Sequence, residues 1–130
     1  MSVIHPTAIV DKKAQLGADV EIGPYCTVGG GAVIGDKVRL ISHVVIDGNT
    51  SIGAGCVIYP FACVGTLTQD LKYAGAKTFV SIGERTTLRE YVTVHSSTIE
   101  GETTRVGNDC SILAYCHIAH ECKVGNGVIM

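Results

Sequence analysis

Several features on which compact two-layer domains depend are scarce in this sequence of 130 residues. It contains no tryptophan, two phenylalanines and 5% aromatic residues in all, although large aromatic side chains normally anchor such cores. Basic residues do not outnumber acidic ones and the formal net charge is −2, so nucleic acids and anionic membranes are not expected as partners. No apolar run is long enough to span a membrane, and the N-terminus lacks the apolar core of a signal peptide. Cytoplasmic residence is therefore the default expectation.

What the sequence does have is an aliphatic residue at every sixth position. The series runs without a gap through Ile4, Val10, Leu16, Ile22, Val28, Ile34, Leu40, Ile46, Ile52, Ile58 and Val64. It resumes at Ile82, Leu88 and Val94, and again at Val106, Ile112, Ile118 and Val124. A fixed internal period is the signature of repeat architectures. Because six is a multiple of the strand period of two, this stripe of aliphatic residues predicts short strands with one inward side chain each.

The repeat predicts an all-β fold, a parallel β-helix of hexapeptide repeats. Three six-residue faces close one triangular coil of 18 residues, and stacked coils pair their backbones in parallel. A small or β-branched residue such as Ala32 or Thr50 stands two positions before the aliphatic residue and is expected to point inward beside it. Glycine often follows the aliphatic residue, as at Gly17 and Gly23, and is expected to permit the bend into the next face.

The same pattern accounts for most of the cysteines. There are six, but no two are spaced as CxxC, the spacing typical of zinc and redox motifs. Five of them take the inward position two residues before an aliphatic residue, namely Cys26, Cys56, Cys110, Cys116 and Cys122. A thiol there behaves as a small apolar side chain, so we expect a structural role for these cysteines and no metal site.

Two interruptions of the stripe predict loops that leave the coil, at about 66–80 and 96–104. The first is polar, and Asp70 stands in it where an aliphatic residue is due. Loops on a rigid scaffold often carry binding residues. A tolerated surface insertion explains the same pattern equally well, so both interpretations stay open.

Three histidines lie close to the second half of the stripe. His95 directly follows Val94, while His117 and His120 flank Ile118 and are expected to point outward. Imidazole titrates near neutral pH and suits proton abstraction from a hydroxyl. Glu121 could hold one ring, but neighbours on a strand point apart, so this requires the geometry of a corner. Catalysis, a metal site and an inert surface all remain open from spacing alone.

Five segments of the chain resemble one enzyme family. They are IHPTAIV, GPYCTVG, TQDLKYAG, REYVTVH and AYCHIAHECKVGN. Together they resemble the UDP-N-acetylglucosamine O-acyltransferases of lipid A biosynthesis in Gram-negative bacteria, which belong to the hexapeptide-repeat acyltransferases. The related N-acyltransferase of the pathway also carries an IAH segment, but it lacks the QDLKYAG loop and has a separate N-terminal uridine-binding domain.

The resemblance implies a specific fold and reaction. The fold is a left-handed parallel β-helix, an exception to the right-handed crossover rule, and the assembly is a homotrimer with active sites between subunits. The reaction is the first step of lipid A biosynthesis, in which an (R)-3-hydroxyacyl group passes from acyl carrier protein to the 3-hydroxyl of UDP-N-acetylglucosamine. It requires no cofactor.

The resemblance also implies roles for single residues. His120 corresponds to the general base, with His117 and Glu121 as further catalytic residues; Glu121 replaces the aspartate that is usual in the family. The residues that correspond to the family's substrate-binding positions are Gln69, Asp70, Lys72 and His95.

The length of the chain departs from the family pattern. Family members continue for several coils and a C-terminal helical domain, whereas this sequence stops in mid-repeat at Met130. We therefore expect one β-helix domain over residues 1–130, truncated at its C-terminus and lacking part of the site. A non-catalytic trimerising module is one alternative. The other is a zinc enzyme similar to γ-class carbonic anhydrases, in which His95, His117 and His120 would bind the metal.

Overall fold

A computed structural model describes residues 1–130, and its regular elements are short parallel strands arranged in three sheets. The first sheet contains β1 (Val3–Ile4), β4 (Glu21–Ile22), β7 (Arg39–Leu40), β10 (Val57–Ile58), β13 (Thr87–Leu88) and β16 (Ser111–Ile112). The second contains β2 (Ile9–Val10), β5 (Thr27–Val28), β8 (Val45–Ile46), β11 (Cys63–Thr66), β14 (Thr93–His95) and β17 (His117–Ile118). The third contains β3 (Gln15–Leu16), β6 (Val33–Ile34), β9 (Asn49–Ile52), β12 (Phe79–Ile82), β15 (Thr103–Val106) and β18 (Lys123–Val124).

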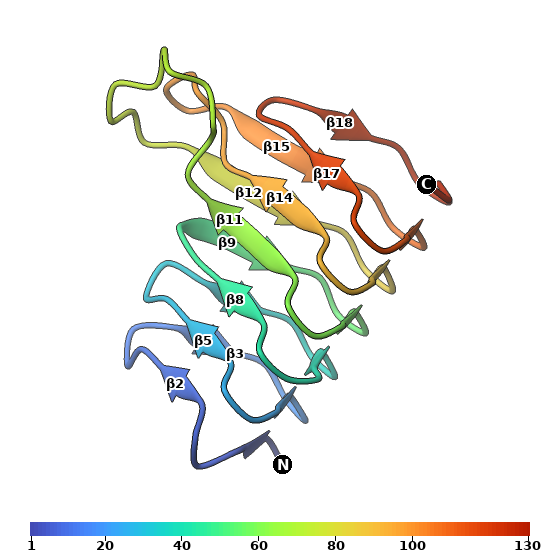
Figure 1. Ribbon diagram of the computed structural model, residues 1–130. Coiled ribbons are helices and arrows are strands. Elements are labelled where there is room, and N and C mark those ends of the chain that lie inside the picture. The colour runs from blue at the N-terminus through green and yellow to red at the C-terminus, as the bar shows by residue number, and fades with distance from the viewer.

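Successive strands of the chain pass from one sheet to the next, so the chain winds through stacked coils (Figure 1). This is the left-handed parallel β-helix that the sequence predicts. None of its elements is a helix with the length and apolarity to span a membrane.

The strand register confirms the coil of 18 residues. Val45 pairs with Cys63, 18 positions later. Cys63 then pairs with Thr93, and Thr93 with His117, so the spacing grows to 30 and then 24 where loops intervene. The loops thus add 12 and 6 residues to the 18 of a regular coil. Both additions are multiples of six, and this is why the aliphatic stripe returns to the interior after each loop.

The aliphatic stripe forms the core. Ile22, Leu40, Ile58 and Leu88 are almost completely buried. Fourteen residues of the stripe and ten residues that stand two positions before a stripe residue make one continuous apolar cluster of 24 buried residues. The exceptions lie at the two ends of the stack, where Ile4 is 44% exposed and Val10, Leu16 and Val124 are only partly buried. A solenoid coil is covered only by its neighbours, and the first coil has a neighbour on one side.

The cysteines follow the same rule. Cys26, Cys56 and Cys110 are buried as predicted, and Cys116 is half-buried. The prediction of burial was wrong for Cys122, which lies in the last turn of residues 1–130 and is exposed. Burial raises the pKa of the Cys26 and Cys56 thiols, which favours their neutral form and an apolar, packing role.

Most of the sharp bends lie three residues after a stripe residue, and, with the exception of Gly65, not at the glycine that directly follows it. Ten non-glycine residues occupy these bend positions with left-handed backbone, φ 51–69°: Asp19, Tyr25, Lys37, His43, Phe61, Arg85, Tyr91, Asp109, Tyr115 and Glu121. Gly23 has a different role, since a Cβ there would lie 1.7 Å from the Ile41 carbonyl oxygen of the next coil. The expectation that these glycines form the bend was therefore wrong; Gly23 lets neighbouring coils approach closely.

Aromatic rings stack along one of these rows of bends, at the edge between the first and second sheets. Tyr25, His43, Phe61, Tyr91 and Tyr115 follow one another with ring centroids 4.9–5.1 Å apart. Such pairs contribute about 0.5–1.5 kcal/mol each beyond the area they bury. The stack gives His43 a structural role. His95, His117 and His120 are not part of it.

Candidate active site

Both loops and His120 occupy the same edge of the β-helix, where the second sheet passes to the third. Loop 1, residues 67–78, joins β11 to β12, and loop 2, residues 96–102, joins β14 to β15. Figure 1 shows the two loops leaving the coils at the same edge. His120 lies between β17 and β18, at the corresponding corner of the next coil. The two predicted interruptions, slightly shorter than expected, are thus stacked beside the HIAH segment.

His120 and Glu121 are in direct contact. The ring Nδ1 of His120 lies 2.8 Å from Glu121 Oε1. Neighbouring side chains on a strand would point apart, but Glu121 has a left-handed backbone with φ 56°. Its N–H donates to the buried Thr104 Oγ1 at 3.1 Å. The corner therefore turns the carboxylate back toward the imidazole.

The second carboxylate oxygen of Glu121 is held by loop 2. Ser97 Oγ donates to Oε2, and so does the Thr98 N–H at 2.5 Å. Burial by itself would raise the pKa of Glu121, but the hydrogen bonds from Ser97, His120 and Thr98 lower it to about 2. Glu121 is consequently ionised throughout the neutral range.

Loop 1 brings a second carboxylate to the other side of the ring. Asp70 Oδ2 lies 3.6 Å from His120 Nε2, and the Asp70 side chain is only 14% exposed. Thr98 Oγ1 donates to the same oxygen at 3.4 Å, and Lys72 Nζ lies 3.9 Å from it. His120 is thereby flanked by one carboxylate at each ring nitrogen.

The two loops are joined to each other. The hydroxyls of Thr78 and Ser96, both buried, are 2.5 Å apart, and the Lys77 N–H donates to the Glu100 carboxylate. These two bonds tie loop 1 to loop 2.

His95 and His117 form a separate pair on the second sheet. Their ring centroids are 4.6 Å apart at 72°, edge to face. His117 is exposed as predicted, and its Nδ1 lies 2.7 Å from Thr93 Oγ1. Burial, and secondarily the nearby charge of His117, lowers the pKa of His95. A neutral His95 is therefore expected at neutral pH.

Not all predicted site residues meet. The structure groups His120, Glu121, Asp70 and Lys72, and it pairs His95 with His117. Gln69 is exposed on loop 1 and lies in none of these contacts.

The sequence analysis did not predict two residues that bind the Glu121 carboxylate, Ser97 and Thr98. The repeat could have indicated Ser97. Ser97 stands three residues after Val94, and Glu121 three residues after Ile118, in strands whose register pairs Val94 with Ile118.

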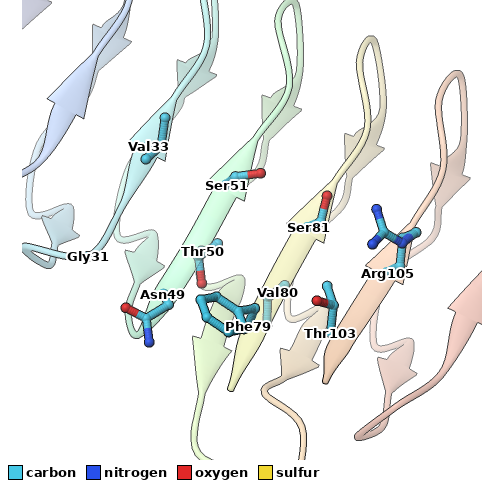
Figure 2. Close-up of a pocket in the computed structure, with 10 residues that line it drawn as sticks. All are labelled: Gly31, Val33, Asn49, Thr50, Ser51, Phe79, Val80, Ser81, Thr103 and Arg105. Carbon is cyan, nitrogen blue, oxygen red and sulfur yellow. The ribbon is translucent and has the colours of Figure 1, made fainter. Parts of the chain in front are cut away.

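The largest surface hollow lies elsewhere, on the outer face of the third sheet. It measures about 380 Å³ and is lined by ten residues, none of them a predicted site residue. Figure 2 shows the lining side chains in two rows across the strands, with Asn49, Phe79 and Thr103 in one row and Val33, Ser51, Ser81 and Arg105 in the other. Arg105 is its only ionisable group, so it offers no acid–base pair comparable with that at His120.

Comparisons with known proteins give a consistent result. The sequence matches the family described as bacterial transferase hexapeptide (six repeats) over residues 1–36 and 103–130. It is 50% identical over 131 aligned residues to an acyl-[acyl-carrier-protein]–UDP-N-acetylglucosamine O-acyltransferase of Thermodesulfovibrio yellowstonii, covering 100% of this chain and 51% of the relative. Identity is 47% to the Chlamydia pneumoniae protein of the same name, over 94% of this chain and 44% of the relative. The chain spans about half the length of these relatives.

Solved structures agree with this match. A UDP-N-acetylglucosamine acyltransferase from Bacteroides fragilis superimposes with a TM-score of 0.96 at 34% identity, over 98% of this chain and 50% of that one. The corresponding enzyme from Campylobacter jejuni gives a TM-score of 0.91 at 41% identity, over 98% and 50%. A perosamine N-acetyltransferase from Caulobacter crescentus is only 23% identical, with a TM-score of 0.76 over 98% and 51%, and shares the fold alone.

Proposed function

Because this hexapeptide-repeat chain corresponds in sequence and in fold to the repeat region of the UDP-N-acetylglucosamine O-acyltransferases, we propose that it carries the general base of that reaction. The resemblance inferred from the sequence motifs is confirmed by these matches. The acyl donor is acyl carrier protein bearing an (R)-3-hydroxyacyl thioester, and the acceptor is the 3-hydroxyl of UDP-N-acetylglucosamine. The reaction, as the first step of lipid A biosynthesis, and the cytoplasmic location are part of this proposal.

One observation carries the proposal: the imidazole of His120 lies between two carboxylates, with Glu121 at Nδ1 and Asp70 near Nε2. A general base must be oriented and must be stabilised once it has accepted a proton. Glu121 orients the ring through Nδ1–H. This leaves the Nε2 lone pair to accept the proton of the sugar hydroxyl.

The chemical step then balances without a cofactor. The hydroxyl oxygen attacks the thioester carbonyl carbon as its proton passes to His120 Nε2. The tetrahedral intermediate collapses, the C–S bond breaks, and the imidazolium returns the proton to the departing carrier thiolate. The products are the 3-O-acyl sugar nucleotide and the free carrier thiol.

The remaining assignments are proposals for binding. Asp70, Lys72 and Gln69 on loop 1 lie at or near the base, so we place substrate contacts there. His117 contributes an exposed ring and His95 a buried neutral one on the adjacent strands. A homotrimer is proposed by analogy with the family. The comparisons do not favour the zinc enzyme, because the matched relatives are acyltransferases.

The test is transfer of an (R)-3-hydroxyacyl group from acyl carrier protein to UDP-N-acetylglucosamine by the wild-type chain and by His120→Ala. Loss of a general base is expected to lower kcat about 10²–10⁴-fold. His43→Ala is the matched control, because His43 belongs to the aromatic stack and should leave the rate unchanged. Turnover that survives in His120→Ala would overturn the assignment of the base. Binding of UDP-N-acetylglucosamine without turnover by the wild-type chain would point to the non-catalytic module.

A further inference from the structure

Ser97 and Glu121 occupy equivalent corners of consecutive coils. Each stands three residues after a buried stripe residue, Val94 and Ile118, which pair directly in β14 and β17. Ser97 is completely buried, although it lies in a loop that leaves the coil. A buried hydroxyl needs hydrogen-bond partners, and the partner of Ser97 is the carboxylate of Glu121.

The other hydrogen-bond partner of Ser97 is a donor, so the Glu121 carboxylate is the acceptor for the Ser97 hydroxyl proton. The Ile99 N–H donates to Ser97 Oγ at 3.2 Å. A hydroxyl has one proton to give, and Ser97 gives it to Glu121 Oε2. The Thr98 N–H, which can only donate, approaches the same oxygen at 2.5 Å. With two donors directed at it, Oε2 has no place for a proton of its own.

The consequence reaches His120 through the other carboxylate oxygen. Oε1 can then act as an acceptor toward His120 Nδ1, 2.8 Å away. A neutral imidazole carries one N–H, and the hydrogen bond made by one nitrogen determines which nitrogen keeps the proton. The proton therefore stays on Nδ1, and Nε2, which faces Asp70 at 3.6 Å, keeps a free lone pair.

We propose that Ser97 is a positioning residue for the base: its hydroxyl holds the Glu121 carboxylate so that His120 keeps its proton on Nδ1 and presents a bare Nε2. Glutamate suits this task because one oxygen reaches loop 2 while the other reaches the imidazole. Loop 2 thereby acquires a role, since it supplies both donors. The effect of Ser97 on rate rests on the proposed function, whereas its effect on the imidazole does not.

The experiment measures both effects on the full chain. Nitrogen-15 NMR of histidine-labelled protein distinguishes a protonated from a bare ring nitrogen, and the His120 signals are identified by their loss in His120→Gln. The variants are Ser97→Ala, Ser97→Thr, which retains a hydroxyl, and Ser96→Ala as the matched control. Ser96 is the neighbouring buried serine of loop 2, but its hydroxyl meets Thr78 and not Glu121.

In the wild type and in Ser96→Ala, His120 should show a protonated Nδ1 and a bare Nε2. Ser97→Ala should mix the two tautomers and lower kcat about tenfold, the lower end of the loss caused by removing a partner that orients a metal-binding histidine, with KM nearly unchanged. Ser97→Thr should restore both.

An unchanged His120 tautomer in Ser97→Ala would overturn the proposal, as would equal losses of rate in Ser97→Ala and Ser96→Ala. If the wild type transfers no acyl group, the proposed function fails, while the NMR comparison still decides the role of Ser97.

Discussion

His120 Nε2 and Asp70 Oδ2 face each other across 3.6 Å, a distance longer than a hydrogen bond. When the neutral ring carries its proton on Nδ1, the unprotonated Nε2 faces the Asp70 carboxylate. Both atoms are then hydrogen-bond acceptors and do not attract each other. The situation reverses when Nε2 accepts a proton, because an imidazolium then lies between Asp70 and Glu121. Asp70 therefore interacts more favourably with the imidazolium that arises during the reaction than with the neutral ring, and such differential stabilisation is the requirement for lowering a barrier.

Asp70→Asn removes this charge and should lower kcat about tenfold. Opposite charges about 4 Å apart near a protein surface interact by about 4 kcal/mol, and a loss of about 1.4 kcal/mol of this gives a factor of ten. Steady-state transfer assays measure the effect. The control is Asp11→Asn, because Asp11 Oδ1 accepts the N–H of the residue two positions on, as Asp70 Oδ1 does, but it lies several coils away. Equal rates in Asp70→Asn and Asp11→Asn would contradict the role of Asp70.

Glu121 should make the chain sensitive to acid over a defined range. Its pKa in the folded chain is about 2, below the ordinary 4.5, so the unfolded chain binds its proton more readily. The stabilisation is complete above pH 4.5 and is lost as the pH falls toward 2. The difference in Tm between wild type and Glu121→Gln should therefore shrink as the pH falls from 4.5 to 2.5. A difference that does not change with pH in that range would show that Glu121 has no depressed pKa.

The fold could be predicted from the sequence because its core is periodic. Each coil repeats the same requirement, so Ile22, Leu40 and Ile58 identify the interior without knowledge of distant contacts. The end positions differ: Ile4 and Cys122 obey the pattern but stay exposed, since burial also needs a neighbouring coil.

The site was predictable only in part. The pair of His120 and Glu121 is adjacent in sequence, and the stacking of the two loops follows from the register. The contact of Asp70 with His120 depends on the path of loop 1, which no period describes. The bends were missed for a similar reason, because residues as different as Asp19, Tyr91 and Arg85 adopt the left-handed backbone there. These residues share a position in the hexad and not a side-chain chemistry.

His95 should weaken the fold below neutral pH. Burial lowers its pKa from 6.5, so the unfolded chain takes up a proton at pH values where the native histidine stays neutral. The free energy of unfolding should consequently fall as the pH drops below 6.5. Urea denaturation at pH 7.5 and 5 should show a smaller drop for His95→Gln than for the wild type. His117→Gln should lie between them, because the charge of His117 is the lesser cause of the shift. Equal drops in wild type and His95→Gln would contradict the prediction.

Gly65 should tolerate no side chain near the end of β11, two residues before loop 1 begins. Its φ is +88°, and an added Cβ would lie 2.0 Å from Thr50 Oγ1 and 2.1 Å from the Asp47 carbonyl oxygen. These two atoms already share a hydrogen bond of 2.6 Å, so neither can move away without breaking it. Gly75 has nearly the same φ, +90°, but no atom within 4 Å of an added Cβ. The two glycines separate the effect of backbone conformation from that of steric overlap.

Gly75→Ala should cost about 1 kcal/mol, the penalty of a left-handed L-residue less the gain from a stiffer unfolded chain. Gly65→Ala should cost on the order of 3 kcal/mol, because the overlap adds roughly 1–3 kcal/mol. Urea denaturation monitored by circular dichroism measures both values. If the two variants lose equal stability, the contact at Thr50 and Asp47 is not tight, and the departure of loop 1 depends on backbone conformation alone. A selective loss in Gly65→Ala would instead show that loop 1, and with it Asp70, begins from a position that only glycine can occupy.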